Sequence, residues 1–242
     1  YWIPDANYIF HDSTETYEGF QPTFESDVID NNFTAGVTGD KSGWNYDLSA
    51  SFGSNAVDYK VDNSQNLDMG AESPTTFNPG GYEFSHSVTN FDLSKSLGMI
   101  TLGLGSEFRF ENFVALAGEE ASYYGGGVQS FPGIQPQNAV DVNRQNFGFY
   151  VDLGADVTDD LYVGMAARSE EYSDFGNSFT WKGAGRFKAM DDRLSLRASM
   201  STGFRAPSLH QIYMSNIQTL ISGGTVSNQG TFNNHSPVIR SL

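Results

Sequence analysis

Apolar and polar residues alternate one by one along most of this chain. The clearest example spans residues 145–172, where Phe147, Phe149, Val151 and Leu153 are separated by polar residues or glycine. The alternation stops at a turn around 159–160 and then resumes with the same period. A period of two predicts β-strands with one apolar and one polar face, because successive side chains of a strand point to opposite sides.

The same pattern recurs often enough to predict about eight strands. It occurs in residues 32–38, 44–53, 57–61, 84–93, 100–111, 179–188 and 194–201. Near Asn55, and again within 84–93, the apolar positions shift by one residue, as they do at a β-bulge. The last forty residues show no clear period. We therefore predict an all-β fold in which consecutive strands form an antiparallel meander.

Strand length and loop length favour a membrane protein. Several strands keep the pattern for about 11 to 15 residues, whereas a tilted strand needs about 9 to 11 to cross a bilayer. Short turns at 39–43, 97–99, 158–160 and 190–192 contrast with longer connections at 62–81 and 118–142. Outer-membrane barrels have short periplasmic turns, longer extracellular loops and aromatic girdles. Aromatic residues on the apolar phase gather near the strand ends: Trp44, Tyr46, Phe108, Phe110, Phe147, Phe149, Phe179 and Trp181.

These features predict a barrel with lipid outside and water inside. Only one face of such a strand must be apolar, which agrees with a hydrophobic content of only 38%. Alternation alone also fits a soluble antiparallel sandwich, so a secreted carbohydrate-binding sandwich remains an alternative. In water, an isolated piece of barrel would expose its apolar face and two edge strands, and we expect it to aggregate.

Composition narrows the partners and the chemistry. A net charge of −16 argues against nucleic acid and anionic membrane surfaces as main partners. The absence of cysteine excludes disulfides and thiolate metal sites. Four histidines, His11, His86, His210 and His235, show no metal-ligand spacing. We therefore expect neither a cofactor nor a metal.

The stretch RLSLRASMSTGFRAPSLHQIY, residues 193–213, carries the most specific signal. It resembles a barrel signature of TonB-dependent outer-membrane receptors, which residues 202–209 match without a gap. Other stretches, such as GWNYDLSASFGSNAVDY and GSEFRFENF, also resemble the family, and the resemblance covers about residues 24–215.

The resemblance implies a barrel of about 22 strands, closed by an N-terminal plug. Residues 1–242 would then be a middle-to-late part of the barrel, with the plug and the terminal strands absent. The family implies a multi-pass protein of the bacterial outer membrane, not an enzyme. It takes up scarce nutrients such as iron–siderophore complexes, haem, cobalamin or oligosaccharides, with energy from TonB delivered through the plug. A passive channel without a plug is the alternative.

Charged residues on the polar phase predict the lining of the lumen. Glu107, Arg109 and Glu111 share one face of a strand, as do Lys182 and Arg186 on another and Arg197 on the next. Paired carboxylates can serve acid–base catalysis, but that needs one carboxyl in an apolar pocket, for which the sequence gives no sign. A cross-strand charge ladder in a wet interior is the favoured interpretation, so we predict no catalytic residue.

The ligand candidates lie outside the strands. Tyr123, Tyr124 and Phe131, in the second long loop, could stack on a sugar ring or a planar chelate, or could only pack the loop. Arg205, in the family signature, could contact a ligand or the plug, or pair with barrel carboxylates. The DFG at 174–176 and the GGG at 125–127 lack the companion residues of kinases and phosphate loops.

Overall fold

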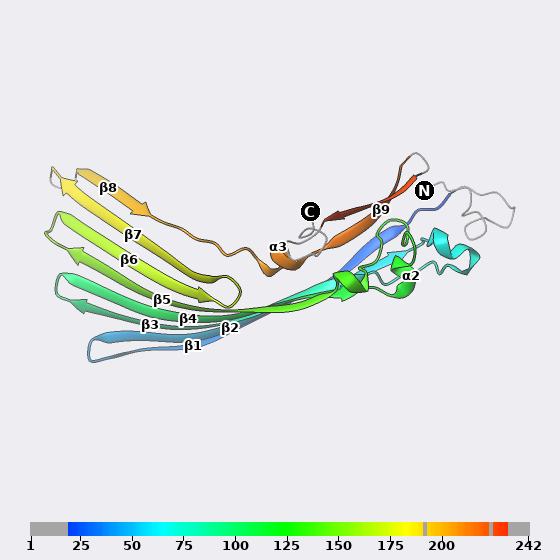
Figure 1. Cartoon of the computed structure of the whole chain (residues 1–242). Helices are drawn as coiled ribbons and strands as arrows, with labels where there is room; N and C mark the ends of the chain where they lie inside the picture. Colours follow the sequence, from blue (N-terminus) through cyan, green and yellow to red (C-terminus); the bar gives the residue numbers. More distant parts are fainter. Residues whose placement is uncertain (1–18, 191–192, 223–224, 232–242) are drawn as a thin grey trace.

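The computed structural model describes residues 19–190, 193–222 and 225–231. Eight strands form one antiparallel sheet in which each strand pairs with the next, so the predicted meander is confirmed (Figure 1). The sheet is open in this chain, with β1 and β8 at its edges. The strands are β1 (Thr23–Lys41), β2 (Trp44–Asp62), β3 (Gly80–Leu97), β4 (Ile100–Ala117), β5 (Val140–Asp156), β6 (Leu161–Tyr172), β7 (Gly176–Ala189) and β8 (Leu194–Ser201).

The short turns at 42–43, 98–99 and 157–160 lie at one end of the sheet, the turn end, and the two long loops lie at the other, the loop end; only the short β6–β7 connection at 173–175 is on the side of the long loops (Figure 1). At the turn end, Ser42 and Gly43 join β1 to β2, and both have positive φ. Two such residues are typical of hairpin turns whose twist matches that of the strands. The loops at 63–79 and 118–139 carry the 3-10 helices η2 (Leu67–Glu72) and η3 (Pro136–Asn138) and the helix α2 (Glu120–Tyr123). The predicted connections agree with these, although positions 191–192 lie outside the described residues.

The bulges predicted near Asn55 and within 84–93 are wrong. The β1–β2 register runs unbroken from Thr23↔Asp62 to Lys41↔Trp44, and the registers of β2–β3 and β3–β4 are also continuous. The apolar positions shift because apolar side chains change faces toward the loop end. There Val61 is buried under the loops with Phe77 and Val128.

One face of the sheet, the apolar face, carries large exposed hydrophobic side chains on every strand. Their exposed fractions include 46% for Leu48, 45% for Leu153 and 65% for Met165. They form a continuous band beside the turn end, which we call the apolar band. The register aligns six of its members from β2 to β7: Tyr46, Leu93, Leu104, Val151, Ala167 and Trp181. At the edges of the sheet, Val37 of β1 lies opposite Leu48 of β2, and Leu196 of β8 lies opposite Phe187 of β7. None of the described helices has the length and hydrophobicity needed to cross a membrane.

The two long loops are tied together at the loop end. Asn66 is fully buried, and its side-chain amide donates to the carbonyls of Ala121 and Tyr124 at 2.9 and 2.8 Å. The Ser64 hydroxyl donates to the carbonyl of Gln129 at 2.6 Å. Where β2 enters the first loop, hydrogen bonds from Lys60 and Thr76 hold the pKa of Asp62 below its usual value. The loops therefore form one folded unit.

After β8, the chain leaves the sheet edge and returns across its other face, the polar face (Figure 1). Residues 202–208, which we call the strap, lead to the short helix α3 (Leu209–Tyr213). Ser208 and Gln211 form a capping box at the start of this helix. Leu209 is buried against Phe113 and Ala115 of β4. Beyond it, β9 (Asn216–Ser222) and β10 (Thr225–Thr231) pair as a hairpin that the sequence pattern did not predict.

Candidate functional site

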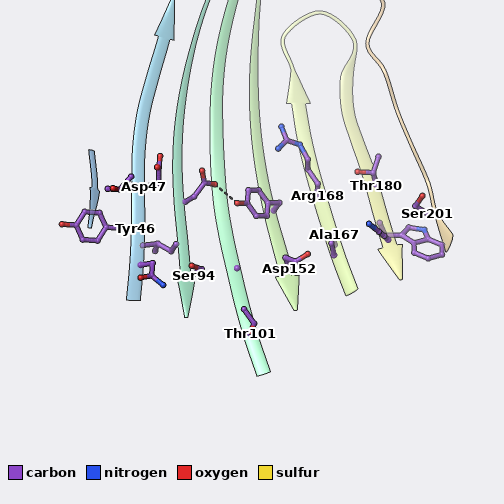
Figure 2. A pocket seen from close by; sticks show the side chains of 18 of the residues that line it. Tyr46, Asp47, Ser94, Thr101, Asp152, Ala167, Arg168, Thr180 and Ser201 are labelled. Atoms are coloured by element: carbon purple, nitrogen blue, oxygen red, sulfur yellow. Dashed lines mark hydrogen bonds between the residues drawn. The ribbon is translucent and has the colours of Figure 1, made fainter. Parts of the chain in front are cut away.

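The polar face forms a broad groove of about 1170 Å³ in the half of the sheet beside the turn end. Figure 2 shows Asp47, Asp152 and Arg168 reaching this groove from different strands. The hydroxyl of Tyr150 donates to Asp92 over 2.7 Å, from β5 to β3. The intervening Gly105 of β4 makes this bond possible, because a Cβ there would overlap both side chains. A hydrogen bond that spans three strands therefore fixes two of the polar side chains in the groove.

A charge ladder continues the polar face toward the loop end; we define it as Glu107, Arg109, Glu111, Arg168 and Glu170. Arg168 contacts Glu170 at 2.9 Å and Glu107 at 3.5 Å, and its guanidinium passes over Gly148. Arg109 lies 3.2 Å from Glu107 and 3.8 Å from Glu111. Acidic and basic groups alternate along β4 and along β6, and Arg168 joins the two strands through Glu107, so the charges form a paired, partly hydrated wall rather than an isolated catalytic carboxyl.

Arg144 of β5 links this ladder to the strap. Its side chain is only 3% exposed and forms a fork with Asp174, with nitrogen–oxygen distances of 2.6 to 3.0 Å. A third nitrogen donates to the carbonyl of Pro207 in the strap at 2.8 Å. The guanidinium also lies 3.7 Å from Glu111. Arg144 therefore satisfies two carboxylates and holds a backbone segment that is distant in the sequence.

Aromatic rings complete this junction. The guanidinium of Arg144 lies 5.9 Å from the ring of Tyr172 and 5.4 Å from that of Phe175. Phe204 of the strap packs on the same two rings at 6.0 and 5.6 Å. Strap and ladder enclose a polar cavity of about 580 Å³. This volume lies in the range of small-molecule sites in proteins.

Arg205 lines this cavity from the strap and is exposed. It makes no ion pair with any carboxylate in the part of the chain that the structure describes, so the geometry does not support the barrel-pairing interpretation. That pairing is made by Arg144 instead. The guanidinium of Arg205 is therefore free to meet a group that enters the cavity.

Lys182, Arg186 and Arg197 lie on the polar face but outside the charge ladder. They surround a separate cavity of about 430 Å³ beside the strands β7 and β8. Arg186 stands directly opposite Arg197 in the register and rests on the ring of Tyr162 at 5.6 Å. Its nearest described carboxylate, that of Asp156, is 3.8 Å away and largely exposed. The six charged residues predicted from the sequence thus belong to two different sites.

The aromatic loop candidates divide in a similar way. The ring of Phe131 packs against those of Phe24 and Tyr59, with centroid distances of 4.7 and 5.4 Å. Of the two roles considered for Phe131, this geometry favours packing of the loop over ligand binding. Tyr123 is half-buried, whereas Tyr124 is 50% exposed and remains accessible to a ligand. His86 and His210 each lie against the ring of Phe84, and the described residues contain no cluster of metal ligands. His11 and His235 lie outside the described residues.

Arg144, Tyr150 and Asp174 were not among the predicted site residues. Tyr150 lies on the polar phase of a predicted strand and Arg144 directly precedes that strand in the same phase, so the face of both could have been inferred. Their partners could not, because Asp174 and Pro207 follow Arg144 by 30 and 63 positions.

Comparison with solved structures identifies similar folds. The siderophore receptor PirA from Acinetobacter baumannii is 15% identical, with a TM-score of 0.60 over 86% of this chain and 30% of that one. A mutant of the ferric enterobactin receptor PfeA from Pseudomonas aeruginosa is 13% identical, with a TM-score of 0.60 over 86% and 30%. The RagAB peptide transporter is 10% identical, with a TM-score of 0.57 over 87% and 26%.

This chain thus spans less than a third of each of these structures. No curated protein matches its sequence. Residues 2–237 match the protein family described as TonB dependent receptor-like, beta-barrel. The chain, with its eight-stranded meander, therefore belongs to the family of TonB-dependent receptor β-barrels.

Proposed function

We propose that this chain forms part of the barrel wall of an outer-membrane importer that takes up a scarce nutrient with energy supplied through TonB. Family membership supports a transport function. The solved structures with similar folds include receptors for siderophores and a peptide transporter. The sheet supplies the two surfaces that such a wall needs, an apolar face toward lipid and a polar face toward the lumen.

The apolar band is the observation that carries the proposal. On β2 it runs from Trp44 to Phe52, and beyond it the same face bears Asp58, Lys60 and Asp62. Nine residues agree with the roughly 9 to 11 that a tilted strand needs to cross the hydrocarbon core. Phe52, Phe108 and Phe147 would mark one border of this core and Trp44 the other. A secreted sandwich would instead bury this face against a second sheet, and the described residues contain no such sheet.

In this orientation the long loops face the outside and the polar face lines the lumen. A ligand captured at the loops would meet Tyr124 and then the strap cavity with Arg205. The positive charge of Arg205 favours an anionic or carboxylate-bearing nutrient, which includes ferric siderophores and peptides. The plug expected from the family would close the lumen and receive energy from TonB.

Fractionation of the native producer tests the membrane assignment. We would probe its outer membrane with an antibody to residues 118–142, comparing boiled and unboiled samples. We expect a heat-modifiable band several times larger than 26.5 kDa that only detergent releases. A soluble band of about this mass would exclude the barrel wall.

Removal of TonB separates the importer from a passive channel. Uptake of the inducing nutrient should stop in a strain without TonB and return on complementation. Equal uptake in both strains would establish the passive channel instead.

A further inference from the structure

A row of aromatic rings crosses the polar face near the loop end. We define this aromatic row as Phe24, Tyr59, Tyr82 and Phe113, one ring from each of the strands β1 to β4. Successive ring centroids along the row lie 5.1, 6.0 and 6.0 Å apart. Phe113 is buried, whereas Phe24 is exposed and the two tyrosines are half-buried. The row therefore presents ring surface on the face that would line the lumen.

A cavity of about 310 Å³ lies beside the row, and we call it the wall hollow. Its polar side chains on this face belong to Asp30, Asn32, Asn55 and His86, and Phe84 lies between them and the row. Asn55 donates to Asp30 over 2.8 Å, which orients the carboxylate while it stays exposed. The ring of His86 lies over Gly53, where a Cβ would approach it to 2.7 Å. The hollow is thus built from oriented hydrogen-bonding groups.

Together, the aromatic row and the wall hollow have the chemistry of a sugar-binding site. A sugar ring carries hydroxyl groups around its edge and weakly positive C–H groups on its faces. The carboxylate of Asp30 and the amide oxygens of Asn32 and Asn55 can accept hydrogen bonds from such hydroxyls. The negative face of an aromatic ring attracts the C–H groups, and Tyr82 and Phe84 place rings beside the hollow. The cavity volume lies at the lower end of the range of small-molecule sites.

The wall hollow suits the other nutrient classes less well. The coordinating oxygens of a ferric siderophore would bring negative charge to the carboxylate of Asp30, which repels it. A peptide is commonly recognised through an unpaired strand edge. The hollow is centred on β2, which is paired on both sides and offers no such edge. The hollow therefore favours a sugar, whereas Arg205 in the strap cavity favours an acid.

We propose that the receptor imports a carboxylate-bearing oligosaccharide, with one sugar ring in the wall hollow and an acidic group at Arg205. This inference rests on the proposed function, because it requires the polar face to line a lumen. His86 lies directly opposite Glu111, which lines the strap cavity, so the two sites are neighbours on the wall. Two strand spacings, roughly 10 Å, separate His86 from Arg144, which holds the strap. A chain of a few sugar units extends over both sites.

A glycan array tests the nutrient class. We would apply the purified full-length receptor in detergent to immobilised acidic oligosaccharides, each paired with its neutral methyl ester, with tetragalacturonate among them. The expected result is binding to an acidic glycan at least about tenfold tighter than to its ester, because only the acid forms an ion pair. Binding to no glycan, or equal binding to acid and ester, would overturn the proposal.

Variants assign the contacts, with the strongest-binding acidic glycan and its methyl ester as probes. Arg205→Gln should weaken binding of the acid by about tenfold and leave that of the ester unchanged. Asp30→Ala should weaken both by about tenfold or more, because the sugar hydroxyls lose a charged acceptor. The control Asp27→Ala, the same change on the opposite face of β1, should alter neither. No loss in Arg205→Gln or in Asp30→Ala, or an equal loss in Asp27→Ala, would refute the assigned contacts.

Every variant is first checked for heat-modifiable assembly in the outer membrane. A receptor that never assembles there contradicts the proposed function, whereas an assembled receptor that binds no glycan contradicts only this inference.

Discussion

Replacement of Arg144 by methionine should free the strap while leaving the barrel wall assembled. Methionine keeps much of the aliphatic volume against Tyr172 and Phe175 but removes every hydrogen bond of the guanidinium. When the strap opens, the contact with Pro207 is broken, whereas the pair with Asp174 stays within the wall. The relevant loss is therefore one charged hydrogen bond in a nearly buried position, about 1.5 to 3 kcal/mol.

That loss can be measured by hydrogen exchange of the full receptor in detergent. In the Met variant, opening of the strap should be about 10 to 100 times more frequent. Peptides that cover the strap and α3 should exchange faster by that factor, including the amide of Ile212, which donates to Ser208 in the native helix. The β1–β2 hairpin, which does not contact Arg144, should keep its protection.

Arg168→Met is the matched control for this experiment. It also removes a guanidinium from the polar face, but the contacts of Arg168 are with Glu107 and Glu170 rather than with the strap. If both variants accelerate exchange in the strap equally, the effect comes from general loss of charge. If neither does, the strap is held by Phe204 and Leu209 alone and the reasoning about Arg144 is wrong.

Four further predictions address the groove, the loops and the apolar face. Gly105→Ala should break the Tyr150–Asp92 bond and lower the heat-modification temperature, at a cost of about 1 to 3 kcal/mol, whereas Gly103→Ala, with space for a Cβ, should not. Asn66→Ala removes the two hydrogen bonds that tie the loops together, leaves the carbonyl of Ala121 without its side-chain donor, and should make residues 118–139 sensitive to protease in intact cells, unlike Gln137→Ala at an exposed site. Met165→Arg should reduce assembly in the outer membrane by about 2 to 4 kcal/mol, whereas Ala166→Arg on the polar face should assemble normally. Residues 1–242 produced alone should scatter light in buffer and become monodisperse in detergent; a monodisperse monomer without detergent would contradict a lipid-facing surface.

The number, order and facing of the eight strands in the main sheet could be predicted because they depend on local alternation. The polarity of each strand residue indicates which face it lies on, so Leu153 and Asp152 can be assigned to opposite faces without knowing the rest of the fold. The shift near Asn55 misled for the same reason. A bulge shifts the apolar positions by one residue, and so does a strand whose other face becomes buried. The two cases look identical in the sequence, and only the loops packed over Val61 distinguish them.

The site was less predictable because its contacts are distant in the sequence. Glu107, Arg109 and Glu111 were identified since they lie on one strand, but their cross-strand partners Arg144 and Arg168 were not. Alternation in the sequence predicts the face on which a side chain lies. It does not predict which residue of the next strand will lie beside it, because that depends on the strand register. The contact with the strap is harder still to predict, because Arg144 binds the backbone carbonyl of Pro207, and every residue has such a carbonyl.

Strands β1 to β5 are about twice as long as the apolar band, and in the proposed importer this length would determine where the ligand is first bound. On β2, the ten residues from Gly53 to Asp62 extend beyond the band. At a tilt of about 40° they raise the rim of the wall by roughly 25 Å above the hydrocarbon core. In the proposed orientation, the mouth of the barrel would be a rigid wall of paired strands, topped by the two tied loops, that extends through the sugar layer of the cell surface. Capture would take place at the height of that layer, where a bulky nutrient need not first reach the lipid.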